Sequence, residues 1–222
     1  MAELGRHARP TYSAHGEDAV LYAIFEEHGG VPERGFYVDV GAYHPTALSN
    51  TARLHAAGWR GINIEPNPVM AGFLAAERPG DVTLRQAAGT PARTADLLFF
   101  GDWASSNTLD PEFAAMISAG QQVAVERAIP TEVVPLADVF DEYLPAATVI
   151  DFLTVDVEGM DVEVLQSNDW DRFRPAVVAT EDLALQLENP TASAVFRLLG
   201  SHGYRLVSHA VKTSFYLRGE GL

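Results

Sequence analysis

Apolar and polar residues alternate in a regular way along most of the chain. Near the N-terminus, apolar positions recur every three or four residues, which predicts an amphipathic helix over residues 16–28. Its apolar positions are Val20, Leu21, Ile24 and Phe25. Glycines 29 and 30 follow directly, and glycine is a common end signal for a helix.

Short runs of β-branched and aromatic residues then alternate with helical stretches. The predicted strands are 36–40, 60–65, 81–87, 150–157, 175–181, 204–210 and 213–218. The predicted helices are 47–57, 68–77, 136–144, 161–166 and 192–199. This alternation predicts an α/β fold with a doubly wound, mostly parallel seven-stranded sheet and helices on both faces. Because no helix separates the last two strands, one of them is expected to run antiparallel.

The alternation breaks between residues 94 and 135. An apolar run (ADLLFF), a polar turn (GDWASSNTLD), a helical stretch at 113–119 and an extended piece near Val133 follow one another. We interpret this part as an inserted, lid-like segment over the cleft. No linker or repeat divides the remainder, so residues 1–222 are expected to form a single domain.

Composition and charge exclude several classes of function. The formal charge of -15 repels nucleic acid, and the 222 residues include no cysteine for disulfides, thiolate metal sites or nucleophilic catalysis. The N-terminus has no signal-peptide pattern, and no stretch approaches the roughly 18 apolar residues of a membrane helix. We therefore expect a cytoplasmic protein without membrane insertion. A homodimer remains open, because net charge does not decide association.

Acidic residues stand where the predicted central strands end. In doubly wound sheets, ligands bind beyond the carboxyl ends of these strands. The residues in question are Asp39, Glu65, Asp156 and Glu181. Asp39 and Glu65 are 26 positions apart, close to the spacing at which an acidic residue accepts hydrogen bonds from a ribose diol. A cofactor that contains a nucleoside fits this pattern.

The first turn, DVGAYHP, favours one nucleoside cofactor over others. A dinucleotide site uses several glycines to hold a pyrophosphate, whereas this turn has only Gly41 and no basic residue. An uncharged or cationic ligand such as S-adenosylmethionine, which carries a sulfonium and no phosphate, suits it better. Each residue alone also has a structural interpretation: Asp39 as a turn cap, Glu65 as a solvated strand end and Gly41 as a positive-φ turn residue.

Several ordered blocks of the sequence resemble the FkbM-type S-adenosylmethionine-dependent methyltransferases. They are YSAHGEDAVL (12–21), GFYVDVGAYHPTALSNT (35–51), GWRGINIEPNP (58–68), SSNTLD (105–110), IDFLTVDVEGMDVEVL (150–165) and RPAVVATE (174–181). The resemblance implies a class I methyltransferase (Rossmann-like) fold. It also implies that S-adenosylmethionine is the cofactor.

The resemblance also implies site residues. The expected cofactor-binding residues are Ser13, Asp39, Gly41, Ala42, Glu65, Pro66, Gln86, Ala87 and Asp156, and the expected substrate-binding residues are His15, Ser106 and Glu181. Among these, Asp39 and Gly41 would line the methionine part, Glu65 the ribose, and Gln86 with Ala87 the adenine. The chain departs from the family pattern at His15, where glutamine is usual, and at Thr213–Ser214, where asparagine is common. Both departures bear on the identity of the acceptor.

Methyl transfer to a hydroxyl calls for a general base near the acceptor. The candidates are Asp156, Glu158, His44 and Glu181. Asp156 comes first because it ends a central strand; its rival role is to bind the cofactor amino group. Carboxylates at these strand ends could also hold magnesium, an alternative that we do not favour because no loop has regular ligand spacing.

The working hypothesis is therefore O-methylation of a small-molecule intermediate in biosynthesis, and the family resemblance implies a sugar as the first acceptor to consider. Two alternatives stay open: N-methylation of a small molecule, and a non-catalytic domain that binds the cofactor or a partner. A nicotinamide dehydrogenase is disfavoured by the missing glycines.

Overall fold

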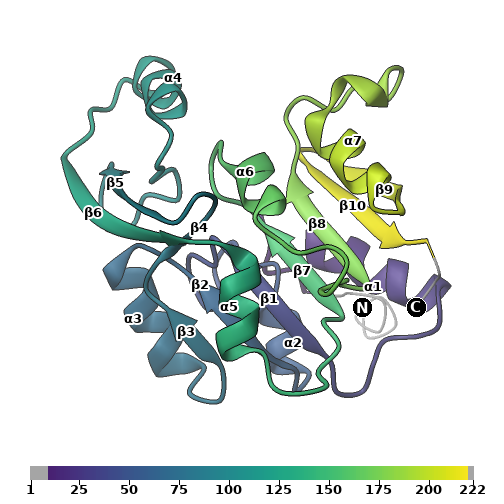
Figure 1. Cartoon of the computed structure of the whole chain (residues 1–222). Helices are drawn as coiled ribbons and strands as arrows, with labels where there is room; N and C mark the ends of the chain where they lie inside the picture. Colours follow the sequence, from purple (N-terminus) through teal and green to yellow (C-terminus); the bar gives the residue numbers. More distant parts are fainter. Residues whose placement is uncertain (1–9, 220–222) are drawn as a thin grey trace, which may run out of the picture.

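A computed structural model describes residues 10–219 and centres on a twisted seven-stranded sheet (Figure 1). In spatial order its strands are β3 (Val82–Leu84), β2 (Arg60–Ile64), β1 (Phe36–Val40), β7 (Phe152–Val155), β8 (Val177–Glu181), β10 (Thr213–Arg218) and β9 (Tyr204–Ala210). Residues 1–9, part of the segment in which no signal peptide is predicted, lie outside the described residues, as do residues 220–222.

The strand directions agree with the prediction. Neighbours from β3 through β8 pair in parallel, whereas β10 pairs antiparallel with both β8 and β9. Of the seven strands described, β10 is therefore the one that runs against the others. The carboxyl ends of β1, β2, β7 and β8 all meet at one edge, where the predicted acidic residues follow.

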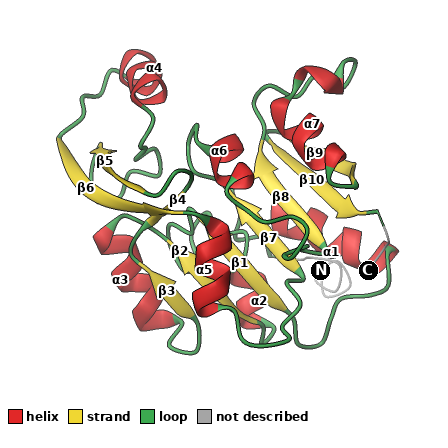
Figure 2. Cartoon of the chain, viewed as in Figure 1, coloured by secondary structure: helices red, strands yellow, loops and turns green. Residues whose placement is uncertain are grey.

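Helices cover both faces of the sheet (Figure 2). On one face, α1 (Glu17–Glu27) and α2 (Ala52–Ala56) pack against a cluster that includes Tyr37 and Phe152. On the other face, α5 (Leu136–Tyr143), α6 (Asp161–Gln166) and α7 (Ala194–Ser201) pack against a cluster that includes Val38 and Leu153. Successive residues of one strand thus enter different cores, because side chains alternate across a sheet.

Two further helical segments belong to the part of the chain around the large sheet. α3 (Pro68–Glu77) follows β2 and packs beside β3, and the 3-10 helix η2 (Pro190–Ala192) precedes α7. Among residues 10–219, no helix has both the length and the apolar character needed to cross a bilayer.

Most of a second, three-stranded sheet comes from the segment predicted as an insertion, residues 94–135, but one of its strands precedes that segment. Its order is β4 (Ala87–Ala88), β6 (Arg127–Val134) and β5 (Arg93–Phe99), and α4 (Pro111–Gln121) lies at its far end in Figure 1. The predicted helix at 113–119 is confirmed within α4. β6 pairs in parallel with β4 and antiparallel with β5.

Two predicted elements are wrong in part. The helix expected over 47–57 forms only at Ala52–Ala56, since Leu48 has a positive φ of 56° and Thr51 lies at the N-cap position. The strand expected over 81–87 is divided between two sheets, because Val82–Leu84 pairs with β2 whereas Ala87 and Ala88 pair with β6. The strand of the large sheet thus ends at Leu84, and Ala87 belongs to the second sheet.

Candidate functional site

The turn after β1 comes very close to the end of β7, and glycine makes this approach possible. Gly41 has φ +78°, and a Cβ at this position would lie 1.9 Å from the carbonyl oxygen of Asp156. The Gly41 N–H donates to the Ile64 carbonyl at 2.9 Å, and the Asp156 N–H donates to the Val40 carbonyl at 3.0 Å. The ends of β1, β2 and β7 are therefore joined at Gly41.

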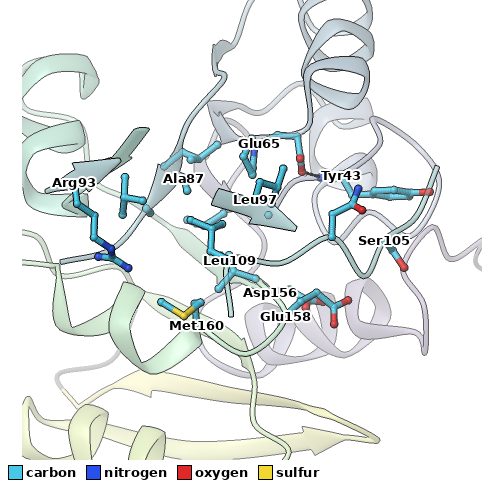
Figure 3. Close-up of a pocket in the computed structure, with 18 residues that line it drawn as sticks. Tyr43, Glu65, Ala87, Arg93, Leu97, Ser105, Leu109, Asp156, Glu158 and Met160 are labelled. Atoms are coloured by element: carbon cyan, nitrogen blue, oxygen red, sulfur yellow. Dashed lines mark hydrogen bonds between the residues drawn. The ribbon is translucent and has the colours of Figure 1, made fainter. Parts of the chain in front are cut away.

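An apolar cavity opens beside this turn. It encloses about 600 Å³, part of it open to solvent. Its wall combines strand ends of the large sheet with residues of the second sheet and of the segment 105–109. The main apolar lining residues are Val40, Ile64, Ala87, Leu97, Leu109 and Val133. Figure 3 shows Glu65 on one side of this cavity and Asp156 with Glu158 on another.

A second, polar cavity of about 780 Å³ adjoins the first. The two cavities share Gly41, Tyr43, Ser105, Asp156 and Glu158. The polar cavity continues toward the N-terminal segment, β8 and the β9–β10 turn. Its further polar lining residues are His15, Glu17, Asn50, Glu181, Lys212 and Thr213. Together the cavities form one cleft with an apolar end and an acidic end.

Two backbone N–H groups hold the Glu65 side chain in the apolar cavity. Its carboxylate accepts hydrogen bonds from the backbone N–H groups of Tyr43 at 2.8 Å and Asn67 at 2.7 Å. Only 6% of the residue is exposed, and this burial raises its pKa to about 7 against the opposing effect of the two N–H groups. Each oxygen keeps a lone pair, so the carboxylate can still accept hydrogen bonds from a ligand.

Asp156 and Glu158 stand at the junction of the cavities. The surface of Asp156 can be reached by solvent, but it faces the two cavities and is surrounded by protein. This burial and the neighbouring Glu181 raise the pKa of Asp156 to about 7. Burial and the charge of Asp156 raise the pKa of Glu158 to about 8. Two carboxyl groups that exchange protons near neutrality thus face one space, an arrangement typical of functional sites.

Three hydrogen bonds attach the loop from residue 100 to 110 to turns beside the cleft. Asn67 donates its side-chain amide to the Asp102 carbonyl at 3.0 Å, and the Tyr43 hydroxyl donates to the Trp103 carbonyl at 2.9 Å. The Thr108 hydroxyl donates to the Glu158 carbonyl at 2.7 Å. The loop from residue 100 to 110 is therefore attached to the same turns that carry Glu65 and Glu158.

Asp39 lies beneath the cleft and lines neither cavity. Strand alternation turns its side chain toward the α1 and α2 face, where it accepts a hydrogen bond from the Thr51 hydroxyl. The same layer holds Arg78, which is 1% exposed and whose donors reach Tyr37, Asn63 and the Pro45 carbonyl. This places Asp39 in a network that supports the turn from below, rather than in the position predicted along the methionine.

His44 also lies outside both cavities. Its Nδ1 accepts hydrogen bonds from the backbone N–H groups of Thr46 at 3.2 Å and Ala47 at 3.1 Å. Its ring packs against Phe73 and Trp103, with centroids 5.7 and 5.9 Å away. The structure therefore does not bring His44 together with Asp156, and nothing in this geometry supports it as the base.

The remaining predicted residues divide between the cleft and its supports. Pro66 and Ala87 line the apolar cavity, and His15 and Glu181 line the polar cavity. The others lie beside the cleft and line neither cavity; they are Ser13, which donates to Asp18, together with Ala42, Gln86 and Ser106.

Sequence reasoning missed several lining residues. Tyr43 lies within the first turn, DVGAYHP, and Ser105 and Asn107 flank the predicted Ser106. Each of these three residues is therefore a sequence neighbour of a residue that was predicted. Glu17 and Lys212 reach the polar cavity from opposite ends of the chain. Only the three-dimensional pairing of β10 with β8 brings Lys212 beside Glu181, with its Nζ 3.6 Å from Oε1.

The acidic side chains in the described part of the chain are not grouped as in a metal centre. Among residues 10–219, no group of three or more His, Asp or Glu side chains is arranged to hold a metal ion. The cleft instead offers an apolar wall, one anchored carboxylate and a pair of near-neutral carboxyl groups. Such a site suits a nucleoside whose far end is cationic.

Comparisons with known proteins agree with this picture. A family model described as the methyltransferase FkbM domain matches residues 39–206. No curated protein matches the chain. A solved structure of methyltransferase FkbM from Methylobacillus flagellatus KT has 15% identity and a TM-score of 0.50, covering 93% of this chain and 56% of that chain. The present chain thus spans a little over half the length of that protein.

Two other solved structures are similar at lower scores. A TehB-like SAM-dependent methyltransferase from Corynebacterium glutamicum ATCC 13032 Kitasato has 9% identity and a TM-score of 0.45, with 98% of this chain and 93% of that chain covered. Precorrin-6y C5,15-methyltransferase from Geobacter metallireducens GS-15 has 13% identity and a TM-score of 0.42, with 90% and 83% covered. The family match and the Methylobacillus structure confirm the predicted class I methyltransferase fold.

Proposed function

This chain belongs to the FkbM methyltransferase family, and from that premise we propose that it methylates a hydroxyl oxygen of a saccharide or other small molecule. The observation that carries the proposal is the pair Asp156 and Glu158 at the junction of an apolar and a polar cavity. Methyl donor and acceptor must meet at one point, and this junction is the space that both cavities reach.

The apolar cavity fits the nucleoside of S-adenosylmethionine. Ile64, Ala87 and Leu97 offer apolar surface to the adenine, and the Glu65 carboxylate is placed to accept hydrogen bonds from the ribose hydroxyls. The close approach at Gly41 keeps the floor between the cavities free of a side chain. When bound, the cofactor supplies an electrophilic methyl group on its sulfonium.

Carboxylates near the junction favour the cationic end of that cofactor. Asp156 and Glu158 lose their protons around pH 7 to 8, so near neutrality they present negative charge to a sulfonium or an ammonium group. Asp156 also serves in our proposal as the base that removes the acceptor hydroxyl proton, because its pKa of about 7 suits proton transfer at neutral pH.

The polar cavity is the proposed acceptor site. His15, Glu17 and Glu181 line it with groups that can hydrogen-bond to hydroxyls, and Lys212, whose Nζ lies 3.6 Å from Glu181, adds a hydrogen-bond donor there. The loop from 100 to 110 covers the junction, and we propose that it excludes water during transfer. Positioning of the acceptor in line with the transferred methyl group accounts for most of the rate in such a reaction.

The test is transfer of labelled methyl from S-adenosylmethionine to a panel of sugars and small hydroxyl compounds, with matched amines alongside. We expect methyl ethers as products and a drop of about 100-fold or more in turnover at saturating S-adenosylmethionine for Asp156→Asn. Because the variant also loses a negative charge beside the sulfonium, its affinity for S-adenosylmethionine should fall more than its affinity for S-adenosylhomocysteine. Glu188→Gln, an exposed residue outside both cavities, serves as the matched control and should retain full turnover. Products methylated only on nitrogen, or full turnover by Asp156→Asn, would contradict the proposal.

A further inference from the structure

A third cavity lies at the opposite edge of the sheet from the cleft. It encloses about 430 Å³ and begins at Ile150, which precedes β7, whereas Asp156 follows the other end of that strand. It shares no lining residue with the apolar or polar cavity. Three arginines line it: Arg172, Arg174 and Arg218. We name it the arginine cavity.

Two of these arginines lack a neutralising partner among the described residues. Arg172 is paired with Asp141 and lies 3.8 Å from Asp169. Arg174 donates to the backbone carbonyls of Trp170 and His202, each at 3.2 Å. Arg218 donates to the Arg174 carbonyl at 3.0 Å, and within residues 10–219 neither Arg174 nor Arg218 forms an ion pair with a carboxylate. This is unexpected in a chain whose net charge is -15.

The partners of Arg174 and Arg218 are backbone carbonyls, which carry no net charge. Among the described residues, Arg218 donates through Nη1 and Arg174 through Nη1 and Nη2. The Nε of Arg218 is buried and has no hydrogen-bond partner among these residues, so a ligand would meet this guanidinium at its terminal nitrogens and not at Nε. An anion in the cavity supplies the missing counter-charge, because an oxyanion accepts several hydrogen bonds from arginine at once.

The rest of the wall is apolar and partly open. Leu144, Ile150 and Phe173 line the cavity beside the arginines, and Val149, which is 59% exposed, lies at its accessible side. We propose that the arginine cavity is a second ligand site, which binds an oxyanion carrying a small apolar group. It is separate from the methyl acceptor site, and it holds whether or not the proposed methylation is correct.

Phenyl phosphate is the probe, titrated calorimetrically into the full chain at an ionic strength of about 20 mM, where charge attraction is weakly screened. The wild-type chain should bind one equivalent with the same affinity in the presence and absence of saturating S-adenosylhomocysteine. Arg218→Met should weaken binding by about tenfold or more, since it removes one of the two positive charges that have no carboxylate partner among the described residues. Arg197→Met is the matched control, because Arg197 also donates to backbone carbonyls but lies outside the cavity.

A second variant keeps the test decisive if Arg218→Met fails to fold. Val149→Asp adds a negative charge at an exposed wall position and should weaken binding by a similar factor. The proposal is overturned if the wild-type chain binds no phenyl phosphate, if both variants bind it normally, or if S-adenosylhomocysteine displaces it.

Discussion

Replacing Gly41 with alanine tests whether the close approach of the ends of β1, β2 and β7 depends on glycine. The new Cβ would lie 1.9 Å from the Asp156 carbonyl oxygen, and ordinary contact begins near 3.4 Å, so the end of β7 must move by about 1.5 Å. A positive φ adds about 1 to 2 kcal/mol of strain for a residue with a Cβ. We expect the free energy of unfolding to fall by about 3 to 5 kcal/mol in total.

The assay is thermal unfolding, with Gly58→Ala as the matched control. Gly58 has φ +97°, but a Cβ added there would meet no atom within 4 Å, so this variant carries the backbone strain without the collision. For a chain of this size, 1 kcal/mol shifts Tm by about 2 to 4 °C. We expect a loss of about 6 to 20 °C for Gly41→Ala and about 2 to 8 °C for Gly58→Ala.

Calorimetric titration with S-adenosylhomocysteine connects this variant to the cleft. Gly41 lines both cavities, and the shift of β7 would displace Asp156, so the folded fraction of Gly41→Ala should bind the ligand more weakly than Gly58→Ala does. Equal Tm losses and equal affinities for the two variants would refute the reasoning, because the collision with Asp156 would then have no consequence.

Three further predictions concern single features of the site. Glu65→Ala should weaken S-adenosylhomocysteine binding by about 1 to 3 kcal/mol through loss of a charge-assisted acceptor; unchanged affinity by calorimetry would remove Glu65 from the ribose. The pKa values of Asp156 and Glu158 are raised to about 7 and about 8, so both side chains gain negative charge between about pH 6 and 9. Over that range, affinity for S-adenosylmethionine should increase by about tenfold relative to affinity for S-adenosylhomocysteine. A constant ratio of the two affinities would contradict the place of these residues beside the sulfonium. Arg78→Met should lower the free energy of unfolding by about 3 kcal/mol or more, since its buried guanidinium makes five hydrogen bonds; a Tm within about 2 °C of wild type would show that this network contributes little.

The same raised pKa values have a consequence for the stability of the ligand-free chain. Both carboxyl groups hold protons more tightly in the folded chain than in the unfolded chain, in which their pKa values are near 4. Their contribution to stability is therefore highest below about pH 4 and is lost as pH rises through 7 to 8. Cofactor binding should offset this loss, because it places a cation beside the two carboxylates.

The strand ends could be predicted from sequence because they depend on local pattern. Apolar runs mark the buried strands, and Glu65, Asp156 and Glu181 follow them at the edge where parallel strands finish. Pro66, which follows Glu65, could be placed for the same reason. Ala87 is expected at the cofactor from the family resemblance, and it lines the apolar cavity although it belongs to the second sheet. The mostly parallel sheet and its antiparallel strand near the C-terminus also followed from the alternation of helices and strands.

Other features depend on contacts that no local pattern contains. Asp39 is adjacent to the cleft in sequence, but strand alternation directs its side chain to Thr51 in the opposite layer. His44 is in the right turn, yet backbone N–H groups occupy its Nδ1. Lys212 enters the polar cavity only because β10 folds back beside β8. The division of residues 81–87 between two sheets likewise depends on β6, which follows much later in the chain.

The central claim is that the cleft binds S-adenosylmethionine, and calorimetric titration of the full chain tests it most directly. The ligands are S-adenosylmethionine and S-adenosylhomocysteine, with NAD as the control because its pyrophosphate has no basic partner at the Gly41 turn. The account predicts one equivalent of binding for each of the first two, mutual competition between them, and no heat from NAD. Binding of NAD, with none of either S-adenosyl compound, would contradict it.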